Sequence, residues 1–431
     1  MERLRGKDLL LVGLTLFSMF FGAGNLIFPP YVGAQAGVNT WLAMVGMAVS
    51  AVGLPVLGVV AVAKAGGLDV MGDRIHPLFS RVFTVACYLA IGPCLAIPRT
   101  ASTSFEMAVI PFAGAQAPLR LFQWAYTLVF FALALWVALK PEKLTDRLGK
   151  ILCPILIALI VVAFAGCLLH PPGGYGPAQA AGYGDSPVIT GFLEGYQTMD
   201  TIAALVFGIT IAISIRARGV TQSREVVFGT VRAGCLAGIL LLVIYAMLAH
   251  MGALAGGRFP GASNGARVLT DLVFYLFGPL GLMLLAAIFV IACFNVCVGL
   301  ITSCGEYFHK LWPACSYRGW AAVFAGVGLL IANIGLDQIL KISGPVLSVL
   351  YPVAIVLILL SLFHDRLKKR PRVYPAAILC TAAASLLLVA ADYLPGLKEA
   401  VSILPLAGQG LGWVLPAAVG LLAGLLLPQS A

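Results

Sequence analysis

The first apolar stretch of the chain contains residues that interrupt a helix. Residues 16–30 read Leu-Phe-Ser-Met-Phe-Phe-Gly-Ala-Gly-Asn-Leu-Ile-Phe-Pro-Pro. Gly22, Gly24 and Asn25 are poor helix formers, and the two prolines that follow lack backbone donors. Backbone groups freed at mid-membrane cannot face lipid, so they must face protein or a polar cavity. The stretch predicts an unwound segment that could bind a charged ligand, with tight helix packing as the alternative explanation.

A second polar interruption precedes the apolar run of residues 202–215. Residues 191–201 read Gly-Phe-Leu-Glu-Gly-Tyr-Gln-Thr-Met-Asp-Thr. A carboxylate at the centre of a membrane helix costs about 2.5–3.5 kcal/mol on insertion scales, so such residues are usually functional. Asp200 is therefore predicted to bind a ligand. Its alternative role is a cap on a helix that begins at Thr201.

The two interruptions together offer groups that suit a zwitterion. The amino-terminal end of a half-helix presents free amides and a positive dipole end to a carboxylate. Carbonyl groups at a carboxyl-terminal end, or the Asp200 carboxylate, could hold an ammonium group or a cation. Interrupted helices at corresponding positions of two repeats indicate the binding site of a secondary transporter.

Arg99 lies deep in another apolar run and requires a polar partner. Glu106 follows two helical turns later on the same helix face, and Glu194 and Glu306 are further candidates. Such an ion pair could be structural, or it could form part of a gate.

Two adjacent hydroxyl residues, Thr302 and Ser303, occur in a later apolar run that also contains Asn295. Hydroxyls inside a helix often bond to a carbonyl one turn earlier. Their functional alternative is oxygen ligation of a small cation.

The elements that must position these residues are membrane-spanning helices. The 431 residues are 61% hydrophobic and only 10% charged, whereas a soluble domain carries roughly 25% charged residues. Apolar runs of about 20 residues, enough to span a bilayer, recur along the chain. We predict about twelve spans, near residues 8–33, 39–63, 82–112, 119–139, 150–169, 188–214, 232–252, 277–306, 319–335, 343–363, 373–391 and 408–428.

Lysine and arginine are unevenly distributed between alternate loops. With the N-terminus inside, 21 of them fall on cytoplasmic segments and 5 on the opposite side, which predicts a multi-pass protein with both termini in the cytoplasm. The net charge of +10 forms no continuous basic face, so no nucleic-acid partner is expected. The ten cysteines lie mostly in apolar runs without a C-x-x-C pair, as packing residues do.

Three motifs resemble the bacterial branched-chain amino acid carrier family. They are Phe-Gly-Ala-Gly-Asn-Leu-Ile-Phe-Pro-Pro (21–30), Ile-Gly-Pro-Cys-Leu-Ala-Ile-Pro-Arg-Thr-Ala (91–101) and Phe-Leu-Glu-Gly-Tyr-Gln-Thr-Met-Asp-Thr (192–201). The resemblance implies an all-α polytopic protein of the leucine-transporter-like superfamily, with two inverted five-helix repeats, broken helices 1 and 6, and two extra C-terminal helices. The implied boundaries are 8–170, 187–363 and 373–428.

The resemblance also implies roles for individual residues. Amides of the unwound first helix would hold the substrate carboxylate, and the start of the second half of helix 6 would hold its amine. The residues implied to bind substrate are Gly22, Ala23, Gly24, Asn25, Thr198, Met199 and Asp200. Apolar neighbours such as Phe20, Phe207 and Phe294 would form the aliphatic pocket.

Related sodium-coupled carriers bind a sodium ion where the first helix meets the eighth. By position, the ligands implied here are Ser18, Phe21, Thr302 and Ser303. The register in the eighth span is open by one residue, because Ile301 stands where a hydroxyl is expected. Asn25 is a candidate ligand of a second sodium ion.

The sequence therefore predicts an alternating-access importer of leucine, isoleucine and valine, coupled to Na⁺, in the bacterial inner membrane. Its expected partners are the amino acid and the lipid bilayer, with no obligatory protein partner. The alternative coupling ion is a proton carried by Asp200, Glu194 or Glu306. An enzyme is disfavoured because H-E-x-x-H and G-x-S-x-G are absent from the sequence. A channel is disfavoured because no selectivity-filter pattern occurs.

Overall fold

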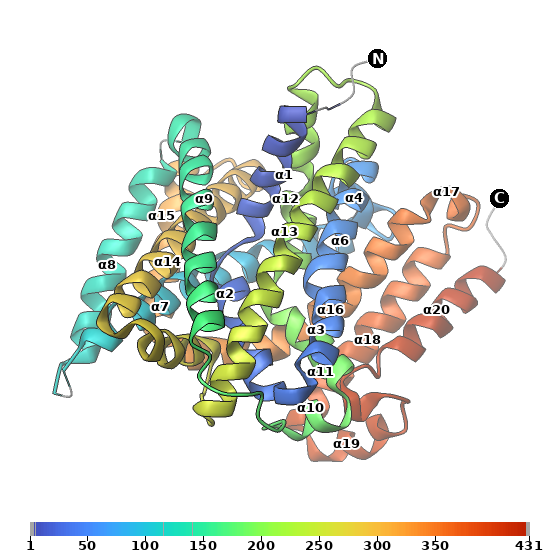
Figure 1. The fold of residues 1–431 in the computed structure, drawn as a ribbon. Helices are drawn as coiled ribbons and strands as arrows, with labels where there is room; N and C mark the ends of the chain where they lie inside the picture. The colour runs from blue at the N-terminus through green and yellow to red at the C-terminus, as the bar shows by residue number, and fades with distance from the viewer. Residues whose placement is uncertain (1–3, 5, 115, 140, 428–431) are drawn as a thin grey trace.

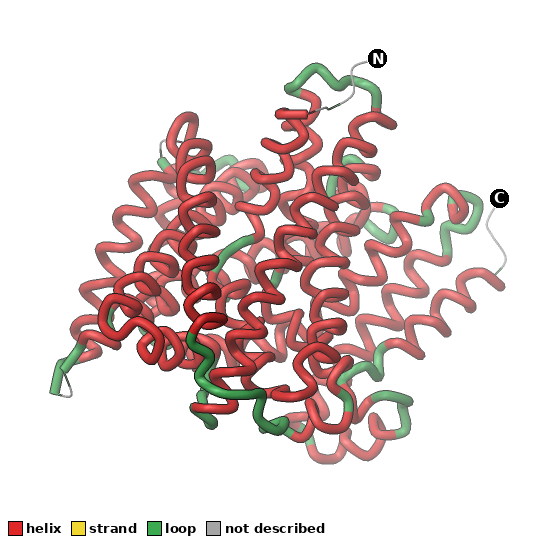
Figure 2. Tube along the Cα trace, viewed as in Figure 1, coloured by secondary structure: helices red, strands yellow, loops and turns green. Residues whose placement is uncertain are grey.

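The computed structural model describes residues 4, 6–114, 116–139 and 141–427, and this part of the chain contains helices and loops but no strand (Figure 2). Each predicted span coincides with one helix or with one interrupted helix, although the expected end of the last span at residue 428 lies outside the described residues. The protein is thus an all-α polytopic membrane protein.

The first five spans contain eight helices. They are α1 (Gly6–Phe20) and α2 (Ala23–Ala36), α3 (Thr40–Ala48) and α4 (Leu54–Ala65), α6 (Pro77–Leu89) and α7 (Ala96–Ala108), α8 (Leu119–Ala138), and α9 (Pro141–Leu169). The next five spans are α11 (Pro187–Glu194) with α12 (Asp200–Arg216), α13 (Ser223–Arg258), α14 (Gly265–Leu311), α15 (Tyr317–Ala332) and α16 (Leu336–Leu362).

Two further spans pack side by side at one edge of the molecule, next to α16 (Figure 1). They are α18 (Val373–Tyr393) and α20 (Val414–Leu426). Short connecting helices complete the described chain: α5 (Leu68–Asp73), α10 (Ala181–Asp185), α17 (His364–Leu367) and α19 (Pro395–Ser402). By length and composition alone, seven described helices could cross a membrane, or eight when the bent pair α11 and α12 counts as one span.

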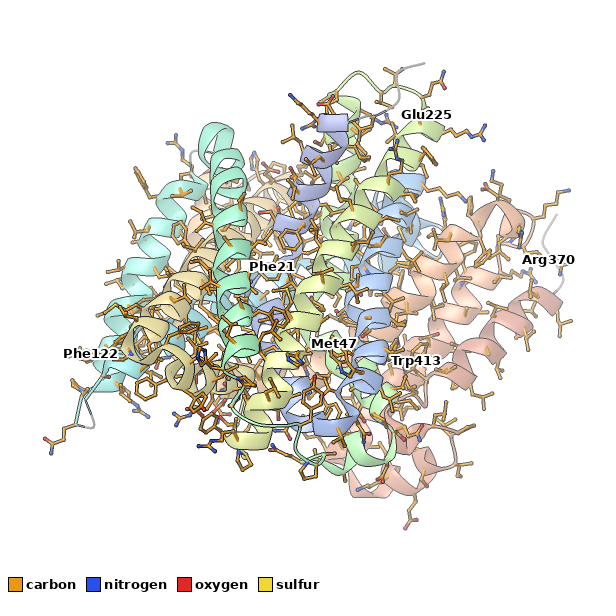
Figure 3. The ribbon with its side chains drawn as sticks, viewed as in Figure 1. Phe21, Met47, Phe122, Glu225, Arg370 and Trp413 are labelled. Carbon is orange, nitrogen blue, oxygen red and sulfur yellow. The ribbon has the colours of Figure 1, made fainter. Side chains whose placement is uncertain are left out.

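The first span is broken as predicted, between Phe20 and Ala23. Gly22 is extended, with φ −132° and ψ −160°. Both prolines lie inside α2, so the break precedes them and the glycine is the residue that leaves the helix. In Figure 3 the labelled Phe21, from this break, lies in the interior of the molecule, whereas Phe122 lies at its periphery.

The sixth span bends by 48° between its two halves. A short 3₁₀ turn, Gly195–Thr198, follows α11. Met199 then adopts a left-handed conformation with φ 67°, which is uncommon for a residue with a side chain. This backbone reversal separates the two halves and places Asp200 at the first position of α12.

Two further helices are interrupted where the sequence analysis predicted no break. Between α6 and α7 the chain makes a π-helical turn in which Gly92 is non-helical. In α14, Gly278 takes φ 58° next to Pro279, a conformation that glycine adopts at little cost.

The expected loop 253–275 is much shorter in the structure, because α13 continues to Arg258 and α14 already begins at Gly265.

Glycines allow two pairs of helices to cross in close contact. A Cβ atom on Gly252 of α13 would lie 2.0 Å from the carbonyl oxygen of Pro30 in α2. A Cβ atom on Gly191 of α11 would lie 1.9 Å from the carbonyl oxygen of Ala43 in α3. The two crossings join spans one and seven and spans six and two, which correspond to each other in two five-span repeats.

Candidate functional site

The breaks of the first and sixth spans line a common cavity of about 40 Å³. Residues of the third and eighth spans also line it. Every residue predicted to bind substrate lines this cavity: Gly22, Ala23, Gly24, Asn25, Thr198, Met199 and Asp200. A space of this size holds only a few water molecules, so an amino acid requires the surrounding helices to move apart.

Asp200 is 2% exposed and belongs to a buried network of three polar side chains. Its Oδ2 accepts hydrogen bonds from Asn25 Nδ2 at 2.6 Å and from the Tyr245 hydroxyl at 3.1 Å. Asn25 Nδ2 also donates to the Tyr245 hydroxyl. The carboxylate thus points across to the first and seventh spans, and Met199 precedes the helix without a side-chain cap. The predicted alternative, a helix cap, therefore does not describe Asp200.

Tyr245 was not among the predicted site residues. It lies in the apolar helix α13 and is completely buried. A tyrosine inside an apolar run usually serves packing, although its hydroxyl requires a partner when buried. That requirement was the only signal available in the sequence, and it does not identify the partner.

Arg99 extends from α7 to the hinge of the sixth span. Its guanidinium donates to the carbonyl oxygen of Gln197 at 2.6 Å and to that of Thr198 at 3.4 Å, and it lies over the ring of Phe28 at 5.5 Å. Within the described part of the chain Arg99 forms no ion pair. The expected pairing with a glutamate is therefore replaced by contacts with backbone carbonyls.

Apart from Thr100, the remaining lining of the cavity is apolar. Phe20 and Phe207 are part of it, as predicted. Phe294 is not; its ring packs edge-on against Phe130, with centroids 5.6 Å apart. The apolar lining comprises Met19, Phe20, Ile91, Ala96, Ala203, Phe207, Val296 and Leu300, together with the aliphatic part of Met199.

The predicted cation ligands lie outside this cavity lining. The Ser18 hydroxyl accepts a hydrogen bond from Asn295 Nδ2 at 3.1 Å. The Thr302 hydroxyl donates to the carbonyl of Val298 at 2.9 Å, which is the intrahelical bond foreseen as its alternative. Among the described residues no hydrogen bond joins Ser18 or Phe21 to Thr302 or Ser303.

The end of α1 nevertheless has a carbonyl without its helical donor. In a continuous helix the amide of Gly22 would bond to the carbonyl of Ser18, four residues earlier. Here that amide donates to Asn25 Oδ1 at 3.0 Å. The Ser18 carbonyl is thereby released for another partner. Among the described residues no group of three or more His, Cys, Asp or Glu side chains could hold a metal ion, so oxygen atoms of backbone and hydroxyl groups are the candidates.

A second cavity, of about 440 Å³, is lined by Phe28 and Gln197, which both contact Arg99. Its charged lining residues are two acids, Glu194 and Asp337, and one base, Lys341. It belongs to the side of the molecule that the charge distribution predicts to face outward.

Comparisons with known proteins agree with this geometry. Residues 5–431 match the family described as "Branched-chain amino acid transport protein". The chain is 42% identical to the branched-chain amino acid permease BraB of Bacillus subtilis, over 98% of this chain and 95% of that protein. It is 38% identical to the branched-chain amino acid permease BrnQ of Escherichia coli strain K12, over 100% of this chain and 98% of that one.

Solved transporters share the fold at low sequence identity. Mhp1, a nucleobase-cation-symport-1 family transporter in a closed conformation, superposes with a TM-score of 0.63 at 13% identity, covering 96% of this chain and 90% of that one. A Na⁺-coupled sialic acid symporter superposes with a TM-score of 0.63 at 14% identity, covering 98% of this chain and 90% of that one. These likenesses show that the chain shares the fold of these transporters.

The family and these relatives are transport proteins rather than enzymes. The match covers nearly the whole chain, and each of the two relatives is aligned over almost its full length. This chain is a member of the branched-chain amino acid transport protein family.

Proposed function

We propose that this protein is a secondary transporter that imports a branched-chain L-amino acid together with Na⁺. The observation that supports this most is a single cavity at two helix breaks, in which free amides, a carboxylate and apolar side chains meet. The relatives are named as branched-chain amino acid permeases, which agrees with such a cargo.

The chemistry of the cavity suits an aliphatic amino acid. The amino-terminal amides of α2, in residues 23–25, would attract the substrate carboxylate through free donors and the helix dipole. Asp200 and its neighbours Thr198 and Met199 would hold the ammonium group. The aliphatic side chain would then lie among the apolar residues, where burial contributes about 1.5–3 kcal/mol for a leucine-sized group.

For the cation we propose the end of α1 and the facing part of α14. The carbonyl of Ser18 has lost its helical donor, and that of Phe21 lies within the break. The hydroxyls of Thr302 and Ser303 would complete the oxygen set, because a hydroxyl that donates to a carbonyl keeps lone pairs free to ligate. Na⁺ would then stabilise the junction of the two spans.

Uptake into liposomes that contain the purified protein tests this proposal. We expect labelled leucine to accumulate when an inward Na⁺ gradient is imposed at equal pH on both sides, and not when choline replaces Na⁺. Thr302→Ala should raise the Na⁺ concentration for half-maximal uptake about tenfold, which is ~1.4 kcal/mol. Thr381→Ala is the matched control, because Thr381 makes the same intrahelical bond, to the Ala377 carbonyl, in the peripheral helix α18.

Proton coupling is the second candidate function, and the buried Asp200 carboxylate favours it. Of the three predicted proton carriers, Asp200 alone lines the small cavity, whereas Glu194 lines the larger one and Glu306 is exposed. Accumulation driven by an imposed pH gradient in the absence of Na⁺ would establish this alternative and contradict sodium coupling.

We further propose that residues 8–170 and 187–363 are the two repeats and 373–428 an appended helix pair, with both termini in the cytoplasm of a bacterial cell. The two glycine crossings, Gly252 with α2 and Gly191 with α3, support this division. The described beginning of α1 and end of α20 lie toward the same side of the molecule (Figure 1), as an even number of spans requires.

A further inference from the structure

Arg99 is a buried cation that is attracted by the Asp200 carboxylate but forms no salt bridge with it. Its side chain is 3% exposed, and no carboxylate of the described residues bonds to it. A buried charge that no counter-charge contacts directly is unfavourable in a protein interior. The contacts with the carbonyls of Gln197 and Thr198 use two of the five guanidinium donors. The site is therefore arranged to receive an anion.

The same cavity contains one acid, but that acid is engaged elsewhere. Oδ2 of Asp200 accepts hydrogen bonds from Asn25 and Tyr245, on the side of the first and seventh spans. Arg99 approaches from the third span. The cavity thus presents one cationic and one anionic side chain that are not bonded to each other, and most of its other lining side chains are apolar.

We propose that Arg99 binds the carboxylate of the transported amino acid, opposite the ammonium group held beside Asp200. This rests on the proposed function, because it assumes an α-amino acid as the cargo. The planar guanidinium forms paired hydrogen bonds with a carboxylate, and its charge makes these bonds stronger than those from neutral amides. The amides of α2 and Arg99 then bind the same group from two sides.

Gly24 provides the room that this arrangement requires. A Cβ atom at this position would lie 2.9 Å from Nη2 of Arg99 and 3.1 Å from the Cα atom of Thr198. The absent side chain leaves room for the guanidinium beside the backbone of α2 at this residue. Phe28 and Gln197, which both contact Arg99, also line the larger cavity.

A purely structural role is the competing explanation, since Arg99 also fixes the hinge carbonyls. Competition against labelled leucine on the purified protein distinguishes the two roles. Leucinamide and 3-methylbutylamine keep the amine and the aliphatic chain but lack the carboxylate. Arg99→Gln should lower the affinity for leucine about thirtyfold, as expected for a lost charge-assisted hydrogen bond of roughly 2 kcal/mol. It should change the affinity for either analogue less than threefold.

Arg99→Lys keeps the charge without the paired geometry, so we expect an intermediate loss for leucine and again little change for the analogues. It also provides the comparison if the glutamine variant does not fold. Arg120→Gln, at an exposed position at the start of α8, is the control and should match the unmodified protein. Asp200→Asn should show the reverse pattern. The affinity for leucine should fall, and the affinity for 4-methylpentanoate, which lacks the amine, should change little.

Equal loss of leucine and leucinamide affinity in the Arg99 variants would mean that Arg99 is only structural, and unchanged leucine affinity would overturn the proposal directly. Absence of leucine binding by the unmodified protein is a different result. It would contradict the proposed function itself, so the two failures are distinguishable.

Discussion

At the scale of single residues, one buried side chain, Asn25, makes most of the polar contacts that connect the site. Asn25 connects the broken first span to both Asp200 and Tyr245, while its Oδ1 accepts the amide of Gly22. One asparagine therefore links the free backbone of the break, where we propose substrate and cation to bind, to the buried acid. A change in that network should alter binding before it alters the fold.

Tyr245→Phe tests the role of this network by removing a single hydroxyl group. It removes the hydroxyl that donates to Asp200 and keeps the ring that packs in α13. Because a hydrogen bond to a charged group contributes about 1.5–3 kcal/mol, we expect the leucine concentration for half-maximal uptake to rise about tenfold or more. Tyr393→Phe, at an exposed position near the end of α18, should have no effect. Unaltered leucine uptake in Tyr245→Phe would show that the hydroxyl serves packing only.

At the scale of elements, glycines determine how closely the half-helices approach their neighbours. α2 has to lie against α13 so that Asn25 reaches Tyr245, and the backbone contact at Gly252 sets that distance. Larger side chains at the crossing would separate the two helices and move the break away from the seventh span.

Gly252→Ala should therefore destabilise the protein. Its Cβ atom would meet the Pro30 carbonyl oxygen at 2.0 Å, too close for any real contact, and overpacking of this kind costs about 1–3 kcal/mol. We expect a lower midpoint of thermal unfolding in detergent. Gly326→Ala is the matched control, because nothing lies within 4 Å of the added atom on α15. Equal midpoints for the two variants would show that the crossing can relax.

At the scale of the whole molecule, the helices form a bundle whose breaks meet at its centre, with α18 and α20 at one edge (Figure 1). The central cavity is small, and a larger cavity lies beside Phe28 and Gln197. For the proposed import, one group of helices would have to move relative to the other.

The orientation of this bundle can be measured with fusions in a bacterial host. Because basic residues concentrate on the side of the termini, a fluorescent protein fused after the last residue should fluoresce and alkaline phosphatase fused there should be inactive. Phosphatase fused after Gly174, in the loop between α9 and α10, should be active. The opposite pattern would reverse the topology and place the larger cavity inside.

The sequence by itself determined the membrane class, the positions of the spans and the first and sixth breaks, and it identified Asp200 as an unusual carboxylate in an apolar run. These are local properties: apolar run length, helix propensity at Gly22 and the cost of a carboxylate in lipid all act within a few residues. The tertiary structure decided which residues meet. Asn25 lies 175 positions from Asp200 and 220 from Tyr245, and Arg99 bonds to carbonyls that no pattern of side chains can indicate. Phe294 faces Phe130 rather than the cavity, because helix rotation is fixed only when neighbouring helices pack.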